Sequence, residues 1–196
     1  MVRALRREYY PWQLLGAVSF WLAIRRLRRI ATKHDFILTD DRVMWLAPEW
    51  EEWKKFYTPS LKLSSDSLIL DAGAGEGETI LLLYLRGFRN FRCVESDASA
   101  FNLLQRNVGR LPDASFDLRN KMFGIEDLNG VAFAKIDIEG GEIELLKLEK
   151  KNFPAEIVVE IHNPTIEKQF LEHLPRIRCL AKGSVPNCNL WSWVKQ

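Results

Sequence analysis

Apolar and polar residues follow two different periods along this chain, and the two periods alternate. Short continuous apolar runs, such as residues 68–70 and 157–159, are typical of strands that are buried on both faces of a parallel sheet. Segments with apolar residues three and four positions apart follow most of these runs and predict helices. The pattern therefore predicts an α/β protein with a mostly parallel sheet covered on both faces.

The predicted elements can be given approximate positions. Strands are expected within seven segments, at residues 68–71, 91–97, 115–123, 131–141, 155–163, 176–183 and 189–196. Helices are expected at residues 78–86, 98–111, 142–153 and 164–174, and from about Pro48 to residue 57. The last two strands are joined by a turn with Gly183 and Pro186, which predicts an antiparallel hairpin at one edge.

The N-terminal segment has a different pattern. Residues 9–24 carry no charge, but as a helix they would span about 24 Å, less than the roughly 30 Å of a bilayer core. A free-standing transmembrane helix is therefore not expected. The apolar residues then narrow to a stripe that predicts an amphipathic helix, formed by Phe20, Ile24, Leu27 and Ala31.

Charge separates this segment from the rest of the chain. Residues 1–33 hold eight basic side chains and one acid, a net charge of +7, so a chain of net charge +2 leaves −5 for the remainder. We divide the chain into a basic, apolar helical arm, 1–45, and a larger domain, 46–196, that contains the motifs given below. The arm could pack on the domain or on a second subunit, bind a membrane surface through residues 9–31, or bind nucleic acid. We expect a cytoplasmic protein, attached peripherally to the inner face of the membrane if the arm binds lipid, and the oligomeric state is open.

A glycine-rich loop follows the strand at residues 68–71 and opens a helix. It reads D-A-G-A-G-E-G from Asp71. Glycine allows a ligand to lie against the backbone at the carboxyl edge of a sheet, where side chains would block it. The carboxylates of Glu76 and Glu78 would repel a pyrophosphate but tolerate a cationic group. The loop therefore predicts a nucleoside-bearing cofactor that is not a dinucleotide.

An acidic residue ends the next predicted strand. The carboxylate of Glu95 can accept two hydrogen bonds from ribose hydroxyl groups at such a position. A strand, a glycine loop, a helix and a second strand with this acid at its end predict one cofactor site. Its candidate residues are Asp71, Ala72, Gly73, Gly75, Gly77, Glu95 and Ser96.

Four segments carry a resemblance to a known family. LDAGAGEGE and the later VESD resemble the first motifs of class I S-adenosylmethionine-dependent methyltransferases, and AKIDIEGGEIELLK and EIVVEIH resemble the FkbM-type family. The match covers roughly residues 50–175. It implies a three-layer, Rossmann-like, seven-stranded methyltransferase sheet, S-adenosylmethionine as the cofactor, and methyl transfer to oxygen on a sugar or other small molecule. A short segment before KIDIEGG leaves the adenine-contacting residue unassigned.

Three side chains are candidates for the reacting centre. Asp137 and Glu139 end one buried strand and His162 ends another, so all three are expected at the edge that holds the cofactor. Asp137 could orient the acceptor or take its proton, and His162 is the alternative base. Asp137 could instead cap the next helix, and His162 could be purely structural. The three could also form an oxygen-rich metal site, although we assign no metal ligand.

The function expected from these observations is O-methylation of a sugar, a lipid-linked compound or another small hydroxyl compound. One alternative is an RNA or protein methyltransferase that uses the basic arm to hold an anionic substrate. A further alternative is a non-catalytic module that binds the cofactor and serves protein interaction.

Overall fold

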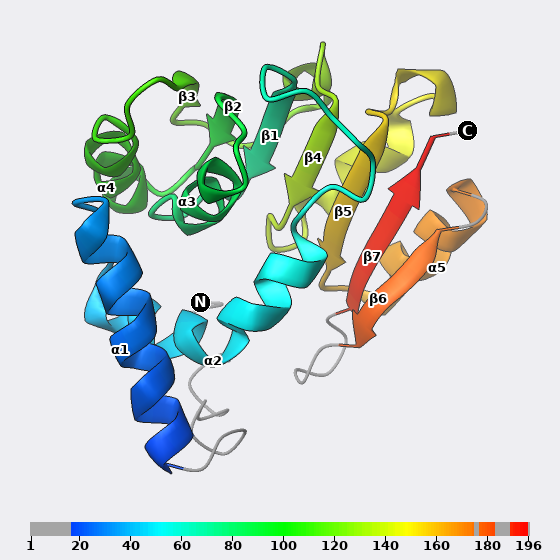
Figure 1. The fold of residues 1–196 in the computed structure, drawn as a ribbon. Coiled ribbons are helices and arrows are strands. Elements are labelled where there is room, and N and C mark those ends of the chain that lie inside the picture. The colour runs from blue at the N-terminus through cyan, green and yellow to red at the C-terminus, as the bar shows by residue number, and fades with distance from the viewer. Residues whose placement is uncertain (1–16, 175–176, 183–188, 196) are drawn as a thin grey trace.

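Seven strands form one mixed sheet in a computed structural model that describes residues 17–174, 177–182 and 189–195 (Figure 1). The strands are β1 (Leu68–Ala72), β2 (Asn90–Val94), β3 (Ser115–Arg119), β4 (Phe133–Ile136), β5 (Glu156–Ile161), β6 (Arg178–Lys182) and β7 (Asn189–Val194). Their order is β3-β2-β1-β4-β5-β7-β6. The first five strands pair in parallel, and β7 is antiparallel to both β5 and β6. The predicted fold class is confirmed, while the turn at Gly183 and Pro186 lies outside the described residues.

Helices cover both faces of the sheet. One face is covered by α1 (Ala17–Lys33), α2 (Asp40–Phe56), α3 (Glu78–Leu85) and α4 (Ala98–Val108). The other face is covered by α5 (Pro164–His173) and the 3₁₀ segments η3 (Ile125–Leu128) and η4 (Gly141–Lys147). A further 3₁₀ segment, η5 (Lys150–Asn152), has no buried residue. Side chains of a strand alternate between these faces, so Ile69 packs with the first group and Leu70 with the second.

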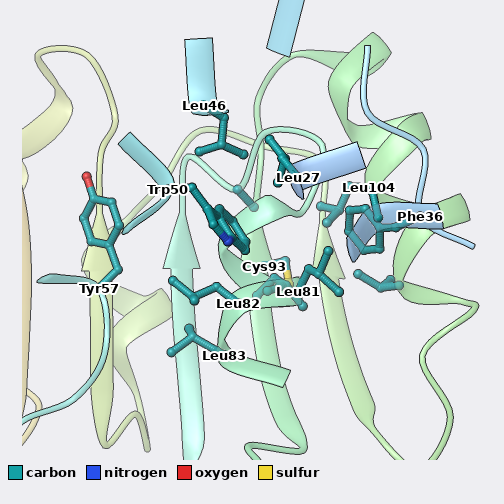
Figure 2. Close-up of a cluster of buried hydrophobic side chains, with 14 of the residues drawn as sticks. Leu27, Phe36, Leu46, Trp50, Tyr57, Leu81, Leu82, Leu83, Cys93 and Leu104 are labelled. Atoms are coloured by element: carbon teal, nitrogen blue, oxygen red, sulfur yellow. The ribbon is translucent and has the colours of Figure 1, made fainter. Parts of the chain in front are cut away.

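The apolar stripe of α1 is buried in the chain's own core. Phe20, Ile24, Leu27 and Ala31 share one cluster with residues of α2, α3 and the sheet, and Figure 2 shows Leu27 beside Leu46 and Trp50. Helix α2 runs across the expected boundary at residue 45. Residues 9–16 of the arm lie outside the described residues. None of the helices in the described part of the chain has the length and hydropathy that crossing a bilayer requires.

Helix α2 begins at Asp40, so the prediction of a start near Pro48 is wrong. The hydroxyl oxygen of Thr39 accepts a hydrogen bond from the Arg42 N–H at 3.3 Å, as a residue at a helix N-cap does. Asp40 and Asp41 then occupy the first turn, where carboxylates interact favourably with the helix dipole. They are part of the helix rather than of a connector.

The prediction of an α-helix at residues 142–153 is also wrong. The structure has two short 3₁₀ segments there, η4 and η5. The buried residues Glu142, Leu145 and Leu148 are spaced by three. A helix with three residues per turn places all of them on one side, whereas an α-helix would rotate them away from one another. In contrast, Asn163 caps α5 as expected, with Pro164 in its first turn.

We predict that α1 contributes to the stability of the whole domain. Leu27→Ala removes a side chain that is 1% exposed, and it should lower the free energy of unfolding by about 2–5 kcal/mol. Leu22→Ala, at a position that is 59% exposed on the same helix, is the matched control and should have little effect. Equal stability of both variants in chemical denaturation would show that α1 is a separate arm.

Candidate functional site

A cleft of about 890 Å³ lies at the carboxyl ends of the parallel strands. The strand order reverses between β1 and β4, and ligands of open α/β sheets bind at such a point. The loops after four strands contribute to the lining, and so does the start of α2. The lining includes Gly73, Gly75, Glu95, Ser96, Lys121, Met122, Phe123, Asp137, Glu139, Thr39 and Arg42.

Glycine is required at the three loop positions for different structural reasons. All three have positive φ values of 75°, 56° and 93°, a conformation that other residues rarely adopt. A Cβ on Gly73 would collide with the carbonyl oxygen of Asp137, so this glycine lets β1 and β4 approach closely. A Cβ on Gly77 would meet Leu104 and Phe36 in the core. Gly73 and Gly75 line the cleft, but Gly77 serves internal packing.

Asp71 and Ala72 support the loop from within β1. Both are fully buried and lie outside the lining of the cleft. Asp71 lies 3.1 Å from the ammonium of Lys135, which also donates a hydrogen bond to the carbonyl oxygen of Gly73 at 2.9 Å. Burial by itself lowers the pKa of Lys135, but the nearby Asp71, Asp137 and Glu78 outweigh it and raise that pKa. The charged lysine therefore ties β4 to the loop after β1.

Glu95 and Ser96 lie where the sequence places them, in the wall of the cleft. The carboxylate of Glu95 accepts hydrogen bonds from the Gly75 N–H at 2.8 Å and the Asp97 N–H at 2.7 Å. Each oxygen of a carboxylate has a second acceptor position. Two backbone donors thus fix the orientation of Glu95 and leave acceptor capacity for a ligand.

The two acids beside the glycines have partners within the protein. Glu76 accepts hydrogen bonds from the backbone and the hydroxyl of Thr39, at 2.8 and 2.6 Å. Glu78 pairs with Arg42, whose guanidinium lies beside Gly75 and whose pKa is raised chiefly by the charge of Glu78. Sequence reasoning did not find Arg42, because α2 reaches the loop only in the folded chain.

The structure brings the three catalytic candidates together. Nε2 of His162 lies 3.6 Å from Oδ1 of Asp137 and 4.0 Å from Oε2 of Glu139. Asp137 and Glu139 line the cleft, while His162 lies behind Asp137. Two further acids, Glu142 and Glu160, contact His162 and were not predicted. Tyr57, also not predicted, donates a hydrogen bond to Glu160.

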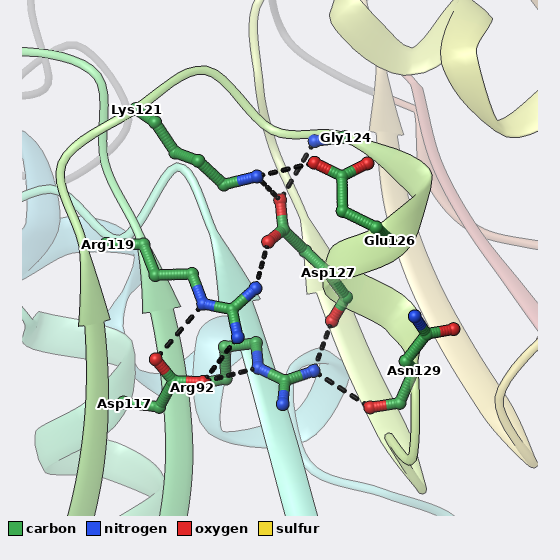
Figure 3. A network of polar contacts seen from close by, with 8 residues as sticks. All are labelled: Arg92, Asp117, Arg119, Lys121, Gly124, Glu126, Asp127 and Asn129. Atoms are coloured by element: carbon green, nitrogen blue, oxygen red, sulfur yellow. Dashed lines mark hydrogen bonds and ion pairs between the residues drawn. The ribbon is translucent and has the colours of Figure 1, made fainter.

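A network of charged side chains fixes the opposite wall, which follows β3 (Figure 3). Arg119 pairs with Asp117 at 2.7 Å and with the fully buried Asp127 at 2.5 Å, and Arg92 also pairs with Asp117. Asp127 further accepts hydrogen bonds from the Gly124 N–H, at 2.9 Å, and pairs with Lys121 at 2.9 Å. These contacts hold the loop that carries Lys121, Met122 and Phe123 into the cleft.

Several solved structures with a similar fold are methyltransferases. The methyltransferase domain of METTL16 is similar with a TM-score of 0.61 at 17% identity, covering 88% of this chain and 96% of that one. FkbM from Methylobacillus flagellatus KT is similar with a TM-score of 0.54 at 18% identity, covering 86% of this chain and 59% of that one. Precorrin-6y C5,15-methyltransferase from Geobacter metallireducens GS-15 has a TM-score of 0.52 at 16% identity, covering 72% and 86%.

No protein-family model and no curated protein sequence matches the chain. The likeness to solved structures lies below 20% identity in each of these three comparisons, so it establishes the fold. The chain has the class I methyltransferase fold, with the antiparallel β6–β7 pair at one edge.

We predict that Asp127 stabilises the fold in a pH-dependent manner. Burial by itself raises the pKa of Asp127, but hydrogen bonds from Gly124, Lys121 and Arg119 outweigh it and keep that pKa below its usual range. Its contribution should therefore be complete above the unfolded pKa of about 4 and fade as the pH falls through the lower folded pKa. Asp127→Asn should cost about 1–3 kcal/mol at pH 7 and flatten the acid limb of the stability curve.

The control is Glu126→Gln, which removes an exposed acid that pairs with the same lysine. Denaturant titrations between pH 2 and 7 measure the free energy of unfolding of both variants and of the wild type. A parallel loss in both variants, or an unchanged acid limb in Asp127→Asn, would contradict the assignment.

Proposed function

We propose that this chain is an S-adenosylmethionine-dependent methyltransferase that acts on a hydroxyl group of a small molecule. One observation supports this most directly. A single cleft has Gly73, Gly75 and Glu95 on one side and Asp137 on the other, within a methyltransferase fold. A volume of about 890 Å³ lies in the range typical of sites for cofactors and drug-sized ligands.

The residues on the β1 and β2 side suit an adenosyl group. Gly73 and Gly75 present backbone without side chains, and Glu95 presents a carboxylate that two backbone N–H groups hold in place. Asp97, which also lines the cleft, caps α4 through the N–H groups of Ser99 and Ala100. We assign Glu95 to the ribose hydroxyls, because a fixed carboxylate acceptor complements two vicinal donors.

Asp137 is the residue best placed to act on the acceptor. Its Oδ2 lies 3.8 Å from the ammonium of Lys135 and its Oδ1 lies 3.6 Å from the imidazole of His162, while the side chain borders the cleft. Bound S-adenosylmethionine supplies a methyl group, whose bond to sulfur breaks as its bond to the acceptor oxygen forms. Asp137 orients the hydroxyl and accepts its proton, and positioning contributes most of the rate enhancement.

We propose the class of acceptor from the FkbM-type resemblance. The segment K-I-D-I-E-G-G-E places Lys135, Asp137 and Glu142 in this cluster. The resemblance of this segment to the FkbM-type family supports a sugar, a lipid-linked glycan or another small hydroxyl compound as the acceptor. A carboxylate next to the cleft suits a hydroxyl group, since a hydroxyl must lose a proton on methylation.

Two substitutions separate cofactor binding from chemistry. Glu95→Gln should weaken S-adenosylmethionine binding by about 1–3 kcal/mol, because charge-assisted hydrogen bonds to the ribose are lost. Asp137→Asn should leave that affinity near the wild-type value and slow methylation of methyl glycosides by about 10² to 10⁴-fold. Calorimetry and labelled methyl transfer provide the readouts, with Glu144→Gln at the cleft rim as the control. A wild-type protein that fails to bind the cofactor would sink the proposal.

The outer face of α1 supports a second proposal, attachment to an anionic membrane surface. Arg25 and Arg29 are exposed on the side opposite the buried stripe, with Lys33 one turn further on. Trp21 and Leu22, at 60% and 59% exposure, lie near the start of the same helix. Exposed basic residues together with exposed apolar side chains suit a surface of anionic lipid. Such attachment would place the cleft near lipid-linked acceptors.

Flotation with vesicles that contain phosphatidylserine tests this attachment. The double variant Arg25→Glu with Arg29→Glu should lose vesicle binding. The control, Lys150→Glu with Lys151→Glu, makes the same change in charge on the other side of the sheet and should bind as the wild type does. Binding to RNA in a gel shift, without binding to vesicles, would instead favour nucleic acid as the partner of α1.

A further inference from the structure

Three side chains at the ends of β4 and β5 are arranged as a set of metal ligands. One ligand atom each from Asp137, Glu160 and His162 lies within 4.8 Å of the others. Nε2 of His162 lies 3.6 Å from Oδ1 of Asp137 and 3.5 Å from Oε1 of Glu160. These distances are at or beyond the limit of a hydrogen bond. They are close to the separation of roughly 3.0 to 3.5 Å between atoms that share a metal ion through bonds of about 2.1 Å.

The imidazole of His162 is held in the orientation of a metal ligand. Its Nδ1 lies 2.7 Å from Oε1 of Glu142, a side chain with no solvent exposure that also accepts a hydrogen bond from the Gly140 N–H. A proton on Nδ1, assigned from this contact, leaves the lone pair of Nε2 directed at the two carboxylates. Histidines that bind metals commonly donate their other N–H to a carboxylate in this way.

The two carboxylates are also oriented by buried partners. The hydroxyl of Tyr57 donates a hydrogen bond to Oε2 of Glu160 at 3.2 Å, which turns Oε1 toward His162. Lys135 lies 3.8 Å from Oδ2 of Asp137, and Oδ1 faces His162. Tyr57 and Lys135 are 3% and 2% exposed, so neither partner belongs to the surface. Each of the three ligands thus has its own supporting contact.

The local charge favours a cation. Four carboxylates surround the single imidazole: those of Asp137, Glu139, Glu142 and Glu160. The ammonium of Lys135 is shared with Asp71, at 3.1 Å, and with the Gly73 carbonyl. Excess negative charge at this edge of the sheet would be offset by a divalent ion.

We propose that Asp137, Glu160 and His162 bind one divalent cation, with Glu139 able to join them from the cleft. One imidazole and two or three carboxylates suit Mn²⁺, Fe²⁺ or Zn²⁺. The role of the ion rests on the proposed methyl transfer. There the ion, held by Oδ1 of Asp137, would polarise the acceptor oxygen and favour loss of the hydroxyl proton to Oδ2 of the same side chain.

Titration of the full chain with Mn²⁺, followed by electron paramagnetic resonance without any cofactor, tests the site. The wild type should bind one ion per chain, and Zn²⁺ should compete for it. His162→Gln, Glu160→Gln and Asp137→Asn should each weaken binding by more than about tenfold. Glu144→Gln, an acid that pairs with Lys147 at the rim of the same cleft, should bind as the wild type does.

Thermal unfolding guards against misfolded variants, because Mn²⁺ should raise the Tm of the wild type and of Glu144→Gln but not of the three ligand variants. Absence of saturable binding to the wild type, or equal binding by all variants, would overturn the site. Calorimetry with S-adenosylmethionine runs in parallel. Cofactor binding without metal binding removes the metal site alone, and metal binding without cofactor binding removes the methyltransferase proposal alone.

Discussion

The buried ammonium of Lys135 is the contact on which this site depends. It is 2% exposed, and it contacts Asp71 in β1, the carbonyl of Gly73 in the glycine loop and, at 3.8 Å, Asp137 after β4. A buried lysine is costly without compensation, so these three acceptors must remain in place together. Because of this, the loop that would hold the cofactor and the carboxylate that would act on the acceptor have fixed relative positions. The close approach that Gly73 permits to the Asp137 carbonyl reinforces the same geometry.

The two walls of the cleft differ in charge and in how they are stabilised. On the β3 side, Arg92, Arg119 and Lys121 are paired with Asp117 and Asp127 into a network that fixes a loop. On the β5 side, carboxylates outnumber cations around His162. The charges of the first wall are paired within the chain. The carboxylates of the second wall outnumber its cations, and a proton or a metal ion would offset this negative charge. In our proposal, the cofactor and the reacting group of the acceptor lie toward opposite ends of the cleft.

The N-terminal helices are part of this arrangement. Thr39 and Arg42 at the start of α2 contact Glu76 and Glu78 in the glycine loop, and α1 packs beside α2 in the same core. The face of α1 that remains exposed is basic. A single helix therefore has two roles in our interpretation, as core on one side and as a contact surface for anionic partners on the other.

The sequence by itself determined the order of strands and helices along the chain, the glycine loop and the acids that end the strands. These features are local: the β1–α3–β2 unit can be identified from apolar runs, turn residues and an acid at a regular spacing. It also determined the amphipathic stripe of α1. The prediction of an α-helix at residues 142–153 failed, because buried residues spaced by three form 3₁₀ turns there. The predicted start of α2 also failed, because the N-cap is Thr39.

Only the tertiary structure decided which side chains meet. Tyr57 and Glu160 are 103 residues apart, and Thr39 and Glu76 are 37 residues apart, so no local spacing could pair them. It also decided that Asp71 supports Lys135, that Gly77 serves packing, and that Glu76 and Glu78 hold the start of α2. The physical reason is the same in each case. A polar side chain beside a cleft takes whichever partner folding brings within hydrogen-bond distance, and that partner comes from another part of the chain.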